Sequence, residues 1–475
     1  MTDSFLGSGS PGGSEFGATT GGVKDLGLAR ALIQGGRVPP AAAFPVEGAF
    51  AEQDLPLAGA ACSRTLCLRG ALGVAPQLEG APAGWVQVAM SSNLDPQAYV
   101  RPSLTIIATV DVSGSMGWNY KSGDTQYASG GALSYRLLKE LAARLLPSDR
   151  VALVEYGDTA RLVLDFVPGG DPRFLAAIEG LHTTGSTNME AGLLLAYKKA
   201  AQAAAEHATQ QHRVMLFTDE QPNVGATSET EFQRLVEGGA AQGVGLTVFG
   251  MGPGLGQSLL VAMSHLRGGN AFTLTQLADV PALMADSWPW MASPLAYDLK
   301  VDLTPQPGFA IGAGFGFPAA GGTAELEAST VFLSRRKGGL LVRLDPQGGQ
   351  GLAGLGARGQ LRYTDLAGAT VTEPLVLDYA GQALDPRGTW FEQPSVGKAV
   401  AVAVGVSALQ HAAELYAKDP AAAIRHLQAA VTRLTDDDAA LSAQGDPALA
   451  PVLQLAKDLL ALMMRGAPQG DLYGR

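Results

Sequence analysis

Continuous apolar runs alternate with helical patterns in the middle of the chain. Four such runs lie at residues 104–110, 151–156, 213–218 and 244–250, and a helical segment follows the first, third and fourth. Runs without polar alternation are typical of strands that are buried on both faces of a parallel sheet. The pattern predicts an α/β domain over residues 101–293, built on a doubly wound, mostly parallel sheet.

Short alternating strands bounded by glycine and proline follow this domain. They are expected at residues 298–303, 326–333, 340–344, 360–363 and 375–379. This spacing predicts a β-sandwich over residues 294–394. Residues 23–100 carry a short helix, at 24–34, and strand-like segments at 62–74 and 85–91. We expect these strands to join the sandwich, so that the α/β domain is either inserted in it or followed by it.

The two ends of the chain differ in character. Residues 1–22 contain Gly-Ser repeats and are expected to be a flexible N-terminus. Residues 395–475 are expected to be helical, because Ile424, Leu427, Val431 and Leu434 recur at helical spacing. The Asp446-Pro447 pair is typical of an N-cap and first turn.

Composition narrows the classes of partner and the location. The formal net charge of -11 over 475 residues disfavours binding to a phosphate backbone, so no nucleic acid is expected. No apolar run approaches the roughly 20 residues of a membrane span, so we expect a cytoplasmic protein. Residues 7–16 also fit an artificial linker that replaces a native export signal, and an extracellular or lipoprotein-anchored location would then apply.

The two cysteines, Cys62 and Cys67, are five positions apart in a segment that has a strand pattern. A strand rises roughly 3.3 Å per residue, which would hold their Cα atoms beyond disulfide distance. We therefore expect both to be packed thiols.

Oxygen-bearing side chains gather directly after the first buried run. Asp111, Ser113 and Ser115 share one face of an extended chain, since they are two positions apart. Open α/β sheets bind ligands beyond the carboxyl ends of their strands, and this is where the three residues fall.

Two further loops are expected at the same end of the sheet. One reads Thr-Gly-Ser-Thr-Asn and contains Thr187, and the other follows the third run and contains Asp219. Hydroxyl and carboxylate oxygens are hard ligands, which suit Mg²⁺, with Mn²⁺ and Ca²⁺ as alternatives, better than zinc or copper. The sequence therefore predicts a metal site made by Asp111, Ser113, Ser115, Thr187 and Asp219.

These three motifs resemble the metal-ion-dependent adhesion site (MIDAS) of von Willebrand factor A (vWA) domains. The resemblance implies that Ser113, Ser115 and Thr187 bind Mg²⁺ directly, while Asp111 and Asp219 act mainly through water. It also implies that an Asp or Glu of a protein partner fills the last coordination position.

A finer resemblance to bacterial YfbK-like proteins involves residues outside the three motifs. It rests on residues 29–40, on Arg150-Val151 and on Asn223-Val224-Gly225. Two departures from the usual vWA pattern lie near the site. Glu220 stands where a glycine is common, and residues 118–126 lengthen the loop after the first motif.

Several simpler interpretations compete with the metal site. Asp111 resembles a helix cap, and serines near strand ends often satisfy backbone groups. Three complementary loops favour a metal site instead. An aspartyl-phosphate hydrolase would need a second Asp where Ser113 stands, and no G-x-S-x-G turn surrounds Ser113 or Ser115.

Other residues with chemical potential have structural explanations. The glycines at 250, 252, 254 and 256 miss the register of a dinucleotide loop. His207 and His212 are expected to be exposed to solvent. Trp288 and Trp290 are expected to close the last helix of the domain against the next domain.

Three functional hypotheses remain open. The first is a metal-dependent protein-protein interaction module that is not an enzyme. The second is an adaptor for a MoxR-type AAA+ ATPase, since vWA proteins in bacteria often act with such motors. The third is a Mg²⁺-dependent hydrolase, although hydroxyl-rich ligation provides no general base.

Overall fold

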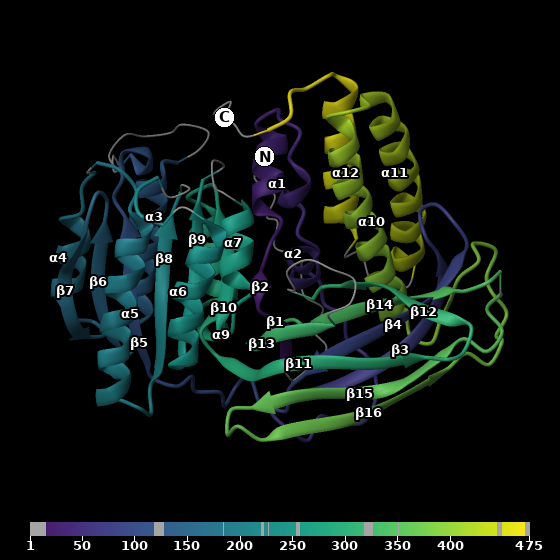
Figure 1. Cartoon of the computed structure of the whole chain (residues 1–475), viewed down its shortest axis with the longest axis horizontal. Helices are drawn as coiled ribbons and strands as arrows, with labels where there is room; N and C mark the ends of the chain where they lie inside the picture. Colours follow the sequence, from purple (N-terminus) through teal and green to yellow (C-terminus); the bar gives the residue numbers. More distant parts are fainter. Residues whose placement is uncertain are drawn as a thin grey trace.

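The structure is a computed structural model of the whole chain, drawn in Figure 1. It describes residues 16–117, 128–183, 185–219, 223–226, 228–252, 257–317, 326–349, 351–443 and 449–470. The expectations for Asp446-Pro447, for residues 7–15 of the N-terminus, for the lengthened loop at 118–126 and for Glu220 therefore lie outside the described residues.

One sheet has the expected parallel arrangement. Its order is β2 (Gly22–Val23), β10 (Gly269–Leu274), β9 (Val244–Met251), β8 (Gln211–Thr218), β5 (Leu104–Asp111), β6 (Arg150–Tyr156) and β7 (Ala160–Pro168). All neighbours are parallel except β7, which is antiparallel to β6. The prediction of a mixed α/β fold around a sheet with parallel strands is confirmed.

Helices cover both faces of this sheet, so its strands are buried on both sides. In β5, Ile106 packs with one core and the next residue, Ile107, packs with the other. The first face carries α3 (Gly130–Arg144), α4 (Pro172–Glu179), α8 (Asp279–Asp286) and α9 (Trp288–Met291). The second face carries α5 (Met189–Glu206), α6 (Glu229–Ala241) and α7 (Gln257–Ser264).

The chain direction reverses beside β5. From β5 the chain continues to β6 on one side, whereas β8 lies on the other. The carboxyl end of β5 is therefore a topological switch point, where open α/β sheets form their ligand-binding crevice. Asp111 is the last residue of this strand.

The second sheet is antiparallel and uses segments from both flanks of the parallel unit. Within the described residues it has ten strands: β1 (Gly17–Thr20), β3 (Cys67–Pro76), β4 (Pro82–Ser91), β11 (Pro294–Pro305), β12 (Phe309–Phe315), β13 (Glu327–Ser334), β14 (Gly339–Pro346), β15 (Gly356–Asp365), β16 (Thr370–Asp378) and β17 (Trp390–Phe391). The strands before residue 92 thus join those after residue 293 in one sheet. The expected sandwich is matched in part. The strands on the two sides of the Gly17–Ser91 pair share one apolar core, but this pair joins them into a single sheet.

A helical layer packs against this antiparallel sheet (Figure 1). It consists of α1 (Gly27–Gln34), α2 (Val46–Ala51), α10 (Pro394–Tyr416), α11 (Pro420–Ser442) and α12 (Ala450–Met464), together with the short turn η1 (Ala41–Ala43). A second short turn, η2 (Gly114–Met116), packs with the core of the parallel sheet. On α11, Leu427 and Leu434 are buried, in line with the predicted apolar face.

Among the described residues, α10 is long and apolar enough to cross a membrane, which the sequence analysis did not anticipate. This is weak support for a span, because 72% of its most apolar stretch is buried within the molecule. A core helix has the same length and composition, and α10 lies at the centre of the helical layer.

Two expectations near the N-terminus are wrong. Cys62 and Cys67 form a disulfide with Cα atoms 5.7 Å apart. The strand begins at Cys67 rather than at Cys62, and the chain bends between them, which shortens their separation. The segment expected to be flexible, residues 1–22, contains the buried strand β1, which pairs with β13 from Gly17 to Thr20.

Candidate metal site

Asp111 lies at the base of the predicted site, fully buried at the end of β5. Its Oδ1 accepts a hydrogen bond of 2.8 Å from the amide of Ser113, and its Oδ2 accepts one of 3.1 Å from the hydroxyl of Thr218. Burial raises the pKa of the Asp111 carboxyl to about 6, although these hydrogen bonds act in the opposite direction. A carboxylate that is costly to ionise in this place would be stabilised by a nearby cation.

A chain of hydroxyl contacts leads from the first loop to the third. The hydroxyl oxygens of Ser113 and Ser115 are 3.1 Å apart, and the Ser115 hydroxyl donates to Asp219 Oδ1 over 3.1 Å. Ser113 is buried, whereas Ser115 is exposed. The contacts place buried and solvent-facing oxygens in one row at the edge of the sheet.

Thr187 belongs to the second loop and is fully buried. Its amide donates to Asn223 Oδ1 over 3.0 Å, and its carbonyl accepts from the Asn223 amide over 3.2 Å. The same loop contacts the first one, because the amide of Gly114 donates to the carbonyl of Gly185 over 3.1 Å. The three predicted segments therefore meet at one end of the sheet.

The donor set fits a hard divalent cation. It offers three hydroxyls and two carboxylates, the oxygen ligands that Mg²⁺ and Mn²⁺ prefer. Across the described ranges, no group of three or more His, Cys, Asp and Glu side chains is placed to hold a metal ion. A metal held at this site would therefore need its serine and threonine hydroxyls.

The sequence analysis missed Asp158, which follows β6 at the same edge of the sheet. Its Oδ1 accepts a hydrogen bond of 2.8 Å from the amide of Ser186. This bond lowers the pKa of the Asp158 carboxyl. The sequence signal was its position just after a buried strand, the same position that identified Asp111.

One expectation about the histidines is wrong. His212 is buried, and its Nε2 lies 3.1 Å from the carbonyl oxygen of His207. His212 lies within β8, so its ring packs at the start of a central strand rather than in solvent. Of the glycine series, Gly250 and Gly252 are described, while Gly254 and Gly256 lie outside the described residues.

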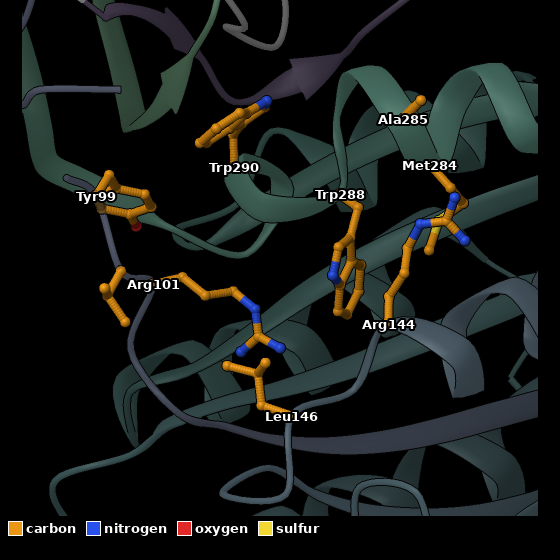
Figure 2. A pocket seen from close by; sticks show the side chains of 9 residues that line it. Tyr99, Arg101, Arg144, Leu146, Met284, Ala285, Trp288 and Trp290 are labelled. Atoms are coloured by element: carbon orange, nitrogen blue, oxygen red, sulfur yellow. The ribbon is translucent and has the colours of Figure 1, made fainter. Parts of the chain in front are cut away.

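A separate pocket of about 510 Å³ lies at the other end of the parallel sheet (Figure 2). Tyr99 and Arg101 line it from the segment that enters β5, and Trp288 and Trp290 line it from the segment that leaves α8. The two tryptophans pack with different cores, as expected for residues that close the last helix. Because β5 spans about 23 Å at its usual rise, this pocket does not belong to the predicted metal site.

The chain resembles known proteins over the segment that carries these loops. The family model for the von Willebrand factor type A domain matches residues 106–221. The uncharacterized protein YfbK of Escherichia coli K12 is 27% identical over 240 residues, which cover 49% of this chain and 40% of YfbK. The match thus spans about two fifths of the length of that curated relative.

A solved structure shows the same fold. The chain aligns with the von Willebrand factor type A protein from Catenulispora acidiphila with a TM-score of 0.50 and 14% sequence identity. The alignment covers 79% of this chain and 87% of that one. The motif order, the parallel sheet and these similarities agree: the chain contains a von Willebrand factor type A domain and is a homologue of YfbK.

Proposed function

We propose that this vWA domain is a metal-dependent protein-protein interaction module. In the proposal, Ser113, Ser115 and Thr187 bind Mg²⁺ directly, and Asp111 and Asp219 hold water molecules around it. A carboxylate of a protein partner supplies the remaining ligand. The observation that carries the proposal is the row of contacts from Asp111 through Ser113 and Ser115 to Asp219.

Charge explains why such a site would bind an acidic partner. Hydroxyl ligands are neutral, so a divalent cation held by three of them keeps much of its positive charge. The bound metal would supply an electrophilic centre for a carboxylate. The burial of Asp111 supports this arrangement, because a cation nearby offsets the cost of ionising a carboxylate there.

The proposal includes no catalytic activity. Serine chemistry needs a base within hydrogen-bond reach of the hydroxyl. In the described part of the chain, the Ser113 and Ser115 hydroxyls bond to each other and to the carboxylates of Asp111 and Asp219, which the proposal assigns to the metal site. The rings of His182, His212, His265 and His426 bond to other groups. The location also remains a proposal: the cytoplasm, or an extracellular or lipoprotein-anchored site if a native export signal was removed. The Cys62–Cys67 disulfide favours the second, because such bonds are rare in the cytosol.

Calorimetric titration of the metal-stripped full chain tests the site. We expect saturable binding of Mg²⁺ and Mn²⁺ by the wild type and its loss in Asp111→Ala and Ser113→Ala. Asp165→Asn is the matched control, since Asp165 lies exposed on β7 of the same sheet and pairs with Lys199. Equal binding by the wild type and both site variants would refute the metal site.

The partner claim has its own test. Proteins retained by the immobilised wild type in Mg²⁺ should elute with a chelator and should not be retained by Asp111→Ala. A complex that forms equally well in the presence of chelator would contradict the proposed role of the metal.

A further inference from the structure

The loop that carries Thr187 is held from both sides by side chains that are not among the five predicted ligands. Asn223 contacts it from the loop after β8, and Asp158 contacts it from the loop after β6. Neither residue is needed to complete the ligand set. Instead, their contacts fix the backbone at Thr187 and at the preceding residue, Ser186.

Asn223 and Thr187 form a reciprocal contact. The Thr187 amide donates to the Asn223 side chain over 3.0 Å, while the Thr187 carbonyl accepts from the amides of Asn223 and Val224 over 3.2 and 3.3 Å. Both backbone polar groups of Thr187 are thereby fixed by one short segment. A shift of Asn223 would move the backbone that carries the Thr187 hydroxyl.

The segment that contains Asn223 is itself attached to α5. The amide of Ala226 donates to Glu190 Oε2 over 2.7 Å, in the first turn of the helix that begins just after Thr187. Gly225 has φ of 76°, and a Cβ at this position would lie 2.8 Å from both Asn188 Oδ1 and Glu190 Oε2. The absence of a side chain at Gly225 therefore lets this segment lie close to Asn188 and Glu190 at the start of α5.

Asp158 contacts the Thr187 loop from the side opposite Asn223. Its carboxylate accepts from the Ser186 amide, and a Cβ on Gly185 would lie 1.9 Å from its Oδ2. Gly185 has φ of 40°, a backbone conformation that favours glycine. The carboxylate therefore lies directly against the backbone that leads to Thr187.

We infer that Asn223 and Asp158 are positioning residues that set the Thr187 hydroxyl for metal binding. The inference rests on the proposed metal site and adds the residues that shape it. Partners that orient metal ligands typically change metal affinity by about 10- to 100-fold when they are replaced. A comparable loss is expected here, although neither side chain binds the metal.

The experiment measures Mg²⁺ affinity of the full chain by calorimetry for two pairs of variants. Asn223→Leu removes the acceptor for the Thr187 amide, and Asn223→Asp retains one. Asp158→Ala removes the acceptor for Ser186, and Asp158→Asn retains one. We expect affinity to fall about 10-fold or more in Asn223→Leu and Asp158→Ala, with most of it restored in Asn223→Asp and Asp158→Asn.

Two exposed residues provide matched controls. Asn93→Leu replaces an exposed asparagine in the connection before β5, and Asp165→Ala replaces an exposed aspartate on β7. Both should retain wild-type affinity. Their behaviour separates a local effect from a general effect of losing a polar surface group.

A double-mutant cycle distinguishes positioning from a general loss of structure. If Asn223 acts through Thr187, Asn223→Leu should cause no further loss of affinity in a Thr187→Ala background. Hydrogen exchange of the metal-free protein gives an independent readout. Exchange over residues 183–189 should accelerate in Asn223→Leu but not in Asn223→Asp.

The outcomes separate this inference from the proposed function. Mg²⁺ binding by the wild type with unchanged affinity in Asn223→Leu and Asp158→Ala would overturn the inference and leave the metal site standing. Failure of the wild type to bind Mg²⁺ or Mn²⁺ would overturn both. Equal losses in the presence and absence of Thr187 would show that Asn223 does not act through it.

Discussion

The hydroxyl oxygen of Ser115 lies 3.1 Å from Oδ1 of Asp219, although 104 positions separate the two residues in the sequence. The contact exists because β5 and β8 are parallel neighbours, so the loops that follow them leave the sheet at the same edge. Ser115 is also the exposed member of the hydroxyl pair. It is therefore well placed to test direct metal ligation without disturbing the core.

Ser115→Cys should change the metal preference of the site. A thiolate is a softer ligand than a hydroxyl, so direct coordination predicts weaker Mg²⁺ binding and stronger Cd²⁺ or Zn²⁺ binding. Calorimetric titration with each metal measures the change. The control is Ser228→Cys, at the exposed N-cap of α6. Unchanged selectivity in Ser115→Cys would argue that Ser115 contacts the metal through water.

Asp25 should make the stability of the protein depend on pH. Burial raises the pKa of this carboxyl from 3.8 to about 6 in the folded state. Its contribution is therefore fully present below about pH 4 and is lost as the pH rises through about 6. The shift corresponds to about 3 kcal/mol.

Urea unfolding of the wild type and Asp25→Asn at pH 4, 5, 6 and 7 measures this effect. The wild type should lose stability relative to Asp25→Asn as the pH rises from 4 to 6, because the amide cannot ionise. The amides of Gly27 and Thr273 bond to different oxygens of the carboxylate, so Asn keeps an acceptor for only one of them. This loss does not depend on pH, so the change of the difference with pH is the readout. A constant difference between the two proteins across this range would contradict the prediction.

Removing one partner of the buried ion pair between Arg101 and Asp149 should lower the free energy of unfolding. Arg101 is nearly buried and binds both oxygens of Asp149, which is fully buried. Arg101→Met would leave the Asp149 charge without its cation, and we expect a loss of about 3–5 kcal/mol. In Arg64→Met, the replaced side chain is exposed and lies 4.0 Å from Glu373, so the loss should be less than about 1 kcal/mol. Similar unfolding midpoints for the two variants would refute the distinction.

The Cys62–Cys67 bridge should contribute modestly to stability. It closes a loop with a sequence separation of five, for which chain entropy predicts about 2 kcal/mol. Cys62→Ser should therefore lower the free energy of unfolding by about this amount in urea. A thiol assay on the denatured, unreduced wild type should detect no free thiol, and detection of two would show that the bridge does not form.

Local patterns sufficed to predict the central strands. The runs that became β5, β6, β8 and β9 are apolar without alternation, because helices cover both faces of the sheet. Strand β12 was missed, since the sequence from Phe309 to Phe315 contains alternating glycines that carry no strand signal. Strands β1 and β2 were missed because they are short and lie in a glycine-rich segment.

The candidate site was predictable for a different reason. Asp111, Ser113 and Ser115 form a local pattern that can be recognised without the fold. The roles inferred for Asn223 and Asp158 depend on which loops become neighbours, and that information is in the sheet order. The disulfide escaped prediction because a bend between Cys62 and Cys67 is set by tertiary contacts rather than by local propensity.

The two residues of β2 pair with β10 at the edge of the parallel sheet, far from the rest of the vWA domain in sequence. Residues 101–293 produced alone would lack this strand, and the backbone of β10 from Asn270 would have free hydrogen-bonding groups. Such a fragment could pair through this unpaired edge with strands of other chains, which makes it a poor reagent for partner capture. In the full chain, β2 occupies this part of the β10 edge.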